Sequence, residues 1–355
     1  MTHDALRQLD ASRTFEATRR FDELSLYHVP FDELNGDDQT ESSLTRMVEH
    51  SGRIAIIGPN GSGKSSVISA VLGPLAIELA EHVVPLRVPV ATEHDETVTE
   101  PGSMARHLIR YVTRWASRER FSLAEQEEFE RGAADLSRRA GSGRTREYHV
   151  GLPLWLANVD FAYQVQTTGE EYESQTSGAD AVEYLKRMLA LFASHELFAV
   201  FVFDDSDTWL RIAGLDRGDV ANAFFMRTIR MMTKELDAGL VLAVHDDYLD
   251  LPGYNHAREW LSGEIRIPRL IDPHLGIDSI LRDRLAIADV PFSIEDVIKS
   301  DVVGHLAKYY EGGQSIRDIL RVAQRSLQHA LSDSSDLITV QLVEQAITEL
   351  AVPFG

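Results

Sequence analysis

A strand, a glycine-rich loop and a helix follow one another within residues 54–72, and this order limits the possible folds more than any other feature of the sequence. The loop reads Gly58-Pro59-Asn60-Gly61-Ser62-Gly63-Lys64-Ser65 and fills every fixed position of the pattern G-x-x-x-x-G-K-[ST]. The apolar run Ile54 to Ile57 precedes the loop, and Val67 to Leu72 follows it with the composition of a helix. The sequence therefore predicts an α/β fold in which a phosphate-binding loop joins a strand to a helix.

The residue types in this loop suit the binding of a nucleoside triphosphate. Glycines let backbone N–H groups turn toward phosphate oxygens, and the N-terminus of the following helix adds the positive end of its dipole. Lys64 is expected to reach the β- and γ-phosphates, while the Ser65 hydroxyl is expected to ligate Mg²⁺. Ser66 completes the candidate nucleotide-binding set with the eight loop residues. ATP and Mg²⁺ are the expected cofactors, and a glycine-rich turn that binds nothing is the alternative interpretation.

Composition narrows the classes of protein to which the chain can belong. Its 355 residues suffice for one large or two ordinary domains, and the hydrophobic fraction of 44% supports a true core. The absence of cysteine excludes disulfides, thiolate catalysis and cysteine-ligated zinc. The N-terminus lacks an apolar signal core and the apolar runs are too short to span a bilayer, so we expect a cytoplasmic protein without a membrane partner. The formal net charge of −21 disfavours unspecific adhesion to nucleic acid but is compatible with a local basic patch.

Two further apolar runs end in polar side chains, as expected for strands whose carboxyl ends meet at a ligand-binding edge. The run Phe198 to Phe203 suits a buried parallel strand and is followed by Asp204 and Asp205. Asp204 is expected to hold Mg²⁺ through water, and Asp205 to orient or deprotonate the attacking water. The run Gly239 to Val244 precedes His245. His245 either senses the γ-phosphate or caps the end of its strand, and both roles stay open at this point.

The order of the motifs separates two classes of P-loop protein. Transporter-type and chromosome-maintenance ATPases carry a signature similar to Ser-Gly-Gly-Gln upstream of the second acidic motif. The stretch Gly312-Gly313-Gln314-Ser315 lies far downstream of Asp204 instead, so we interpret this similarity as chance. The last part of the sequence is helical in character, with an apolar stripe at helical spacing that includes Ile280 and Leu285. A helical region is therefore expected after the sheet.

In this order of motifs the chain resembles the AAA+ ATPases, and within them the clade of replication initiators, origin-recognition-like proteins and transposition-regulator ATPases. The matching segments are Phe203-Asp204-Asp205-Ser206-Asp207, Ile280-Leu281-Arg282-Asp283-Arg284-Leu285, Ala323-Gln324-Arg325-Ser326-Leu327 and Leu337 to Val343. The resemblance implies an α/β parallel sheet sandwiched by helices, followed by a small helical lid. It divides the chain into an N-terminal arm (1–26), a base domain (27–275, with an insertion at about 117–180) and the lid (276–355). It also makes Arg317 the second sensor, a lid arginine that contacts the γ-phosphate.

Four departures from the family pattern qualify what the resemblance implies. Asp205 stands where the family has a catalytic Glu and is one methylene shorter, so slow hydrolysis is expected. His245 stands where the family commonly has Asn, Thr or Ser. The arginine finger that one subunit donates to the next has three candidates here, Arg258, Arg266 and Arg269. The sequence also stops soon after the lid, without the winged helix of replication initiators, and in this respect is closer to transposition regulators.

The region between the first helix and the strand before Asp204 is longer than a simple α/β connection needs. It begins with an expected strand, Leu86 to Val90, and continues into a helix expected at Ser103 to Ser117. One face of that helix carries an arginine at every fourth position, namely Arg106, Arg110, Arg114 and Arg118. In the family this helix often meets DNA, which makes the four arginines candidate contacts to DNA phosphates. The alternative is a solvated face, or a face paired with acidic residues elsewhere. Residues Tyr148 to Thr168 are expected to contain a β-hairpin.

These observations support an ATPase that uses nucleotide-dependent self-association as a switch. The leading hypothesis is an AAA+ switch that assembles as a ring or filament on double-stranded DNA and recruits a protein partner of unknown identity. The alternative is a signalling or defence ATPase that acts on a protein effector without touching DNA, which the net charge of −21 favours. A pore-loop remodeller is less well supported, because Ala91 to Gly102 contains no aromatic side chain.

Overall fold

The computed structural model describes residues 2–17, 20–36, 38–50, 52–78, 82–89, 95–116, 121–127, 129, 145–150, 161–166, 178–204, 218–290 and 292–351. Contacts between residues divide the chain into two compact units. The lid unit comprises Met1–Ser43, Gly58–Val71 and Arg266–Gly355, and the sheet unit comprises Leu44–Ile57 and Leu72–Ile265. Each unit is therefore built from segments that lie far apart in the sequence.

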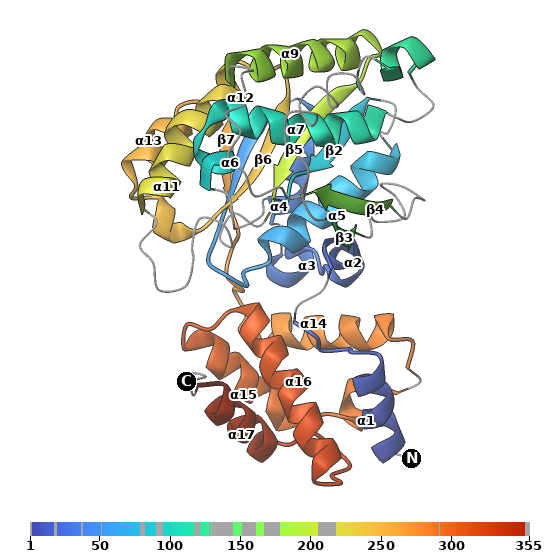
Figure 1. Cartoon of the computed structure of the whole chain (residues 1–355). Helices are drawn as coiled ribbons and strands as arrows, with labels where there is room; N and C mark the ends of the chain where they lie inside the picture. The colour runs from blue at the N-terminus through green and yellow to red at the C-terminus, as the bar shows by residue number, and fades with distance from the viewer. Residues whose placement is uncertain are drawn as a thin grey trace. The chain divides into compact units, whose positions relative to one another are not determined.

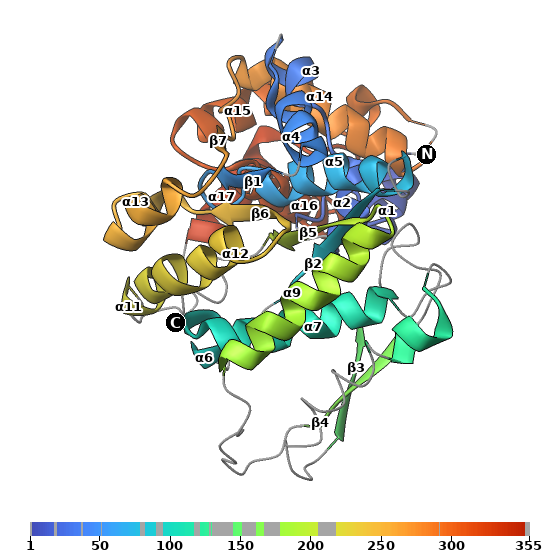
Figure 2. The same cartoon turned by 90° about the horizontal axis from the view of Figure 1, so that it is seen from above.

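The sheet unit contains a five-stranded sheet (Figure 1) in the spatial order β2-β5-β6-β1-β7, for which Figure 2 labels every strand. The strands are β1 (Arg53–Ile57), β2 (Val83–Arg87), β5 (Phe198–Phe203), β6 (Gly239–Val244) and β7 (Gly263–Arg266). β2, β5, β6 and β1 pair in parallel, with Ile57 opposite Val244 and Phe203 opposite Leu242. The three strands that precede predicted functional segments thus end at one edge of the sheet, which is where parallel sheets bind ligands. The predicted α/β P-loop fold class is confirmed.

The central strands are apolar along their length, as expected for parallel strands covered by helices. Every residue of β6 is buried, and in β1 and β5 only the first residue is less than buried. Two long helices, α7 (Pro101–Ala116) and α9 (Gly178–Ser194), pack side by side in this unit (Figures 1 and 2). Glycines allow their close approach, because a Cβ on Gly102 would lie 2.2 Å from the Cα of Gly178.

Shorter elements complete this part of the chain. Helix α4 (Thr40–Glu49) precedes β1. The helices between the strands include α5 (Lys64–Glu78), α6 (Asp95–Thr99), α11 (Gly218–Ala223), the π-helix η2 (Phe224–Ile229), α12 (Arg230–Lys234), η3 (Asp246–Tyr248) and α13 (Pro252–Arg258). β3 (Thr145–Val150) and β4 (Phe161–Gln166) form a separate antiparallel pair with Tyr148 opposite Tyr163, which confirms the strand pairing expected there. Within the described ranges, no helix has both the length and the apolar character needed to cross a membrane.

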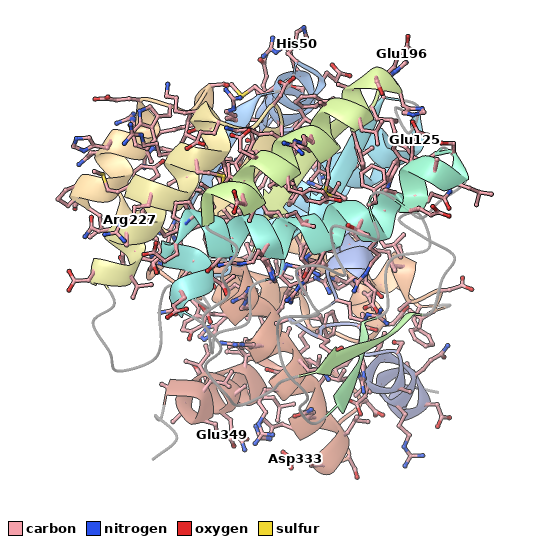
Figure 3. All side chains as sticks on the ribbon, turned by 45° about the horizontal axis from the view of Figure 1, so that its top comes forward. His50, Glu125, Glu196, Arg227, Asp333 and Glu349 are labelled. Carbon is pink, nitrogen blue, oxygen red and sulfur yellow. The ribbon has the colours of Figure 1, made fainter. Side chains whose placement is uncertain are left out.

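The lid unit contains the expected C-terminal helices. They are α14 (Pro273–Ile287), η4 (Ile294–Asp296), α15 (Ser300–Glu311), α16 (Ile316–Ser332) and α17 (Val340–Ala351). α14 packs against α15 and α16 against α17, and Leu281, Leu327 and Val343 are among the fully buried side chains of the shared core. Glu349 on α17, which Figure 3 labels, accepts hydrogen bonds from Arg325 Nε at 2.8 Å and His329 Nε2 at 3.1 Å on α16.

The N-terminal helix belongs to the same core. α1 (Thr2–Ala11) packs against α16, with Leu6 and Leu9 fully buried. Gln324 Nε2 donates to Asp10 Oδ1 at 3.0 Å across a sequence separation of 314 residues. Helix α1 packs into the lid core because its apolar side chains repeat on one helix face. The division of the chain into an arm at 1–26, a base domain and a lid stays a prediction. The short helices α2 (Phe21–Leu24), η1 (Ser25–Tyr27) and α3 (Phe31–Asn35) follow α1.

Two strands differ from the expectations. The second strand runs from Val83 to Arg87, whereas the sequence predicted Leu86 to Val90, and it contains Pro85. Proline has no N–H for the ladder, but β2 is an edge strand of the sheet, where proline is tolerated. The edge strand β7 was not expected, because its four residues are mixed in burial and too short to show a period.

Candidate nucleotide-binding site

The phosphate-binding loop has the backbone conformation that its glycines predict. Gly61 and Gly63 have φ angles of +77° and +104°, in the left-handed region that favours glycine. Lys64, the first residue of α5, is only 6% exposed. Its Nζ donates to the carbonyl oxygens of Gly58 at 2.6 Å and Pro59 at 3.1 Å. The ammonium group is therefore held against the loop that it is predicted to serve.

The donors around this loop fit a phosphate group. Ser62 Oγ is buried and has no hydrogen-bond partner among the described residues. A buried hydroxyl without a partner costs about 1–3 kcal/mol unless a ligand or water satisfies it. Phosphate oxygens accept hydrogen bonds, and Lys64, the Ser62 hydroxyl and the N-terminus of α5 all donate them. The residues present therefore suit the nucleotide phosphates that the motif predicts.

The predicted second sensor lies beside this loop within the lid unit. Arg317 is the second residue of α16, whose start is fixed by a capping box between Ser315 and Asp318. The backbone N–H of Arg317 donates to the carbonyl oxygen of Gly61 at 3.3 Å. A Cβ on Gly61 would lie 2.6 Å from the Cβ of Arg317, so glycine is needed for this approach. The start of α16 and the loop are thus in contact, while contact of Arg317 with a γ-phosphate stays a prediction.

Asp204 follows β5 and has a partner that sequence reasoning missed. Its buried carboxylate accepts two hydrogen bonds from Arg87 at the end of β2, from Nε at 2.9 Å and from Nη2 at 3.0 Å. The strands β2 and β5 are neighbours, with Arg87 opposite Val202, which brings the two side chains to the same edge. Such a bidentate pair offsets the charge of a buried carboxylate. Asp205, the predicted base, lies outside the described residues.

We expect Arg87→Gln to lower the free energy of unfolding by about 1–3 kcal/mol, because Asp204 would stay buried without its cation. Breaking a fully buried ion pair costs more than this, but the Arg87 side chain is 37% exposed, so solvent screens part of the interaction. Asp204→Asn in the same chain should recover most of the loss, and urea denaturation of the four members of the double-mutant cycle measures it.

The matched control for this cycle is Arg227→Gln. It removes an exposed pair in the sheet unit, in which Arg227, labelled in Figure 3, meets Glu100 at 2.8 Å. Exposed pairs contribute little, so the expected loss is below about 1 kcal/mol. An equal cost of Arg87→Gln with and without Asp204→Asn would show that the two side chains are not energetically coupled.

His245 lies directly after β6 and is buried. Its Nδ1 accepts a hydrogen bond from the backbone N–H of Asp247 at 3.1 Å and so caps the short helix η3. Of the two roles that the sequence left open, the structure shows the cap. In the neutral ring this leaves Nε2 to carry the proton. Sensing of a γ-phosphate by His245 stays a prediction.

The three candidates for the arginine finger differ in their surroundings. Arg258 pairs with Glu264 at 2.8 Å. Arg269 lies over the ring of Tyr310, 4.7 Å from its centroid, and its Nη2 donates to the Tyr310 carbonyl oxygen at 2.9 Å. Arg266 is an exposed residue at the end of β7. Arg258 and Arg269 would each have to leave these partners to reach a neighbouring subunit, and the choice among the three stays open.

A cluster that the sequence did not predict joins the N-terminal segment to the start of α5. His28 Nδ1 lies 3.0 Å from the hydroxyl oxygen of Ser66, and His28 Nε2 lies 2.7 Å from Oε1 of Glu41. The same Glu41 oxygen accepts a hydrogen bond from the backbone N–H of Phe31 at 3.1 Å. The His28 side chain is 7% exposed. No spacing rule connects these residues, because His28 follows η1, Glu41 lies on α4 and Ser66 lies on α5.

The predicted helix with the arginine face is present as α7. Met104, Leu108 and Val112 are buried, as its apolar period predicts. Arg110 is exposed, Arg106 Nη2 donates to Ser103 Oγ at 3.3 Å, and Arg114 lies 5.8 Å from the centroid of the Tyr111 ring. Arg118 lies outside the described residues. DNA contact by this face stays a prediction.

Comparison with known proteins shows the fold. No family profile matches the sequence, and no curated protein does. The structure of the Aeropyrum pernix ORC1 protein in complex with DNA matches with 16% identity and a TM-score of 0.51, over 93% of this chain and 69% of that one. The ADP form of the Aeropyrum pernix ORC2 protein matches with 12% identity and a TM-score of 0.50, over 91% of this chain and 72% of that one. The chain therefore has the fold of these two structures, which agrees with the α/β fold with a phosphate-binding loop that its sequence predicts.

Proposed function

We propose that this protein is an AAA+ ATPase that binds ATP with Mg²⁺ and uses the bound nucleotide as a switch. The observation that carries the proposal is the contact between the phosphate-binding loop and the start of α16, from the Arg317 N–H to the Gly61 carbonyl oxygen. A group that binds the loop acts directly on the first turn of a helix in the lid core, so a phosphate gained or lost there alters the position of that helix. The ORC2 structure that shares the fold is an ADP form, which supports nucleotide binding by this chain.

The proposed reaction is hydrolysis of the γ-phosphate. Lys64 and Arg317 stabilise negative charge on the phosphates, Asp205 orients or deprotonates the attacking water, and His245 senses the γ-phosphate. Ser65 and Asp204 hold Mg²⁺, which offsets phosphate charge when bound. Asp204 is suited to hold the metal through water even while paired with Arg87, because each carboxylate oxygen has a second lone pair.

Assembly on double-stranded DNA with other copies of the chain is the second part of the proposal. The ORC1 structure that shares the fold is a complex with DNA. On α7, Arg106 and Arg114 are partly exposed and Arg110 is exposed, on the side opposite the buried residues. Arginines at this spacing suit a row of phosphates, and each contact makes binding weaker as salt rises.

Light scattering tests this assembly. We expect the molar mass of the protein assembly to increase only when a non-hydrolysable ATP analogue with Mg²⁺ and duplex DNA are both present. Changing Arg106, Arg110 and Arg114 to Glu should abolish the DNA-dependent growth and leave nucleotide affinity unchanged. The control variant changes Arg227, Arg230 and Lys234 to Glu, which are exposed in the same unit and alter the net charge equally, and it should still assemble.

A protein effector without DNA is the alternative partner, and the formal net charge of −21 is the observation that favours it. In that case the particle grows with the ATP analogue alone, and duplex DNA has no effect at any salt concentration. If wild type and the variant with Arg106, Arg110 and Arg114 changed to Glu form assemblies of equal size on DNA, this arginine face is not the DNA contact. Nucleotide-dependent assembly would still stand in that case.

A further inference from the structure

The cluster of Glu41, His28 and Ser66 determines where one hydroxyl proton points. Ser66 immediately follows the phosphate-binding motif, within the first turn of α5. Its hydroxyl has a single proton to donate. In the structure its oxygen lies 3.0 Å from His28 Nδ1, so His28 and a phosphate oxygen are competing partners for that proton.

The protonation of Glu41 fixes the tautomer of His28. Burial acts to raise the pKa of Glu41, but hydrogen bonds from His28 and from backbone N–H groups outweigh it, so the pKa lies below its ordinary value. At neutral pH Glu41 is therefore ionised and can only accept hydrogen bonds. The Nε2 of His28, 2.7 Å away, must carry a proton, and in the neutral ring Nδ1 is then a bare acceptor.

Two arrangements of the same atoms follow. With neutral His28, the Ser66 hydroxyl donates to Nδ1 and has no proton left for a phosphate oxygen, which can only accept. With protonated His28, Nδ1–H donates to the Ser66 oxygen, and the hydroxyl proton is released for another acceptor. A positive charge beside the loop also favours an anionic ligand.

We propose that His28 is a positioning residue for the nucleotide, which turns the Ser66 hydroxyl toward phosphate when it takes up a proton. This inference rests on the proposed nucleotide-binding function and adds its regulation by protons. Nucleotide binding is accompanied by proton uptake at His28, and affinity is highest when His28 is charged. Affinity therefore falls as the pH rises and His28 gives up this proton.

Other groups near His28 can change how strongly its protonation affects nucleotide affinity, but they do not connect it to the loop. On α14, Asp283 interacts electrostatically with His28, and burial raises the pKa of Asp283 above its ordinary value. Arg284 on the same helix lies over the ring of Tyr27, 4.6 Å from its centroid, and Tyr27 is the residue before His28. Phe31 packs edge-on at 6.3 Å between ring centroids. Among the described neighbours, only Glu41 and Ser66 hydrogen-bond to the His28 ring in a way that couples it to the loop.

Titration calorimetry tests the proposal with the Mg²⁺ complex of adenosine 5′-(β,γ-imido)triphosphate between pH 6 and 8. Buffers with different ionisation enthalpies give the number of protons taken up. We expect wild-type affinity to fall as the pH rises, by at most about tenfold per pH unit because a single proton is taken up. His28→Gln should lose this slope. A terminal phosphate titrates near pH 6 itself, so the readout is the difference between wild type and variant.

Two further variants separate this role from a merely structural one. Ser66→Ala keeps the His28–Glu41 pair and removes the hydroxyl that His28 orients, so its slope should fall below that of wild type to the part that the charge of His28 contributes alone. This variant also tests the proposal if His28→Gln does not fold. His195→Gln removes a comparable pair in the sheet unit, in which His195 Nε2 lies 2.9 Å from Oε1 of Glu125 (labelled in Figure 3), and it should keep the wild-type slope.

The outcomes distinguish the inference from the proposed function. If wild type binds the nucleotide with the same pH slope as His28→Gln, or if Ser66→Ala keeps the slope, the role of His28 is wrong. If wild type and Lys64→Ala both fail to bind the nucleotide at every pH, the proposed nucleotide-binding function itself is wrong.

Discussion

Lys64→Ala is expected to weaken binding of Mg²⁺–ATP by about 10- to 100-fold, which is the effect of losing a charge-assisted hydrogen bond in a buried site. The ammonium group of Lys64 is buried against the loop, where it contacts the carbonyl oxygens of Gly58 and Pro59. A bound phosphate offers it a stronger acceptor than either carbonyl, because the phosphate is charged. Calorimetry or fluorescence titration with a labelled nucleotide measures the change.

The control is Lys234→Ala, which removes the same charge from an exposed position at the end of α12. Its affinity should equal that of wild type within twofold or so, since a distant surface charge is screened at physiological salt. Unchanged affinity in Lys64→Ala would contradict the phosphate-binding assignment of the whole loop, whatever the fold.

Leu9→Ala is expected to lower the stability of the lid core by about 2–5 kcal/mol, the usual cost of removing a buried leucine side chain. Leu9 is fully buried between α1 and the C-terminal helices. Hydrogen exchange at the amides of α14 to α17 reports the stability of this unit separately from the rest of the chain.

Leu26→Ala provides the comparison, because Leu26 has the same side chain at 66% exposure in a nearby segment. Surface substitutions usually change stability by less than about 0.5 kcal/mol. If both variants lose equally little protection, the packing of α1 against α16 does not stabilise the lid core.

The parts of the site that act through local backbone were predictable from the sequence. The loop from Gly58 to Ser65 requires glycines, a lysine and a hydroxyl at fixed spacing, and the apolar runs before Asp204 and His245 identify buried parallel strands. The shared edge follows from the same pattern once the fold class is known, whereas the sequence does not predict the strand order β2-β5-β6-β1-β7.

Side-chain partners between distant segments were not predictable in this way. The sequence places Arg87 only within a strand, since nothing in its neighbours indicates a carboxylate at the end of the adjacent strand. His28 and Glu41 carry no motif, and their relation to Ser66 appears only when the segments are packed together. For α1, periodicity indicates an apolar face but cannot name the helix that covers it.

The hydrogen bond between Asp10 and Gln324 has a consequence for the synthesis of the protein. The two residues are 314 positions apart, so a ribosome that adds 5–20 residues per second makes the second one about 15–60 seconds after the first. During that interval the apolar face of α1 has no native partner, and the lid core cannot close until nearly the whole sheet unit has been translated. Helix α1 therefore reaches its native packing only after α16 has been made, and until then its apolar face is exposed to aggregation.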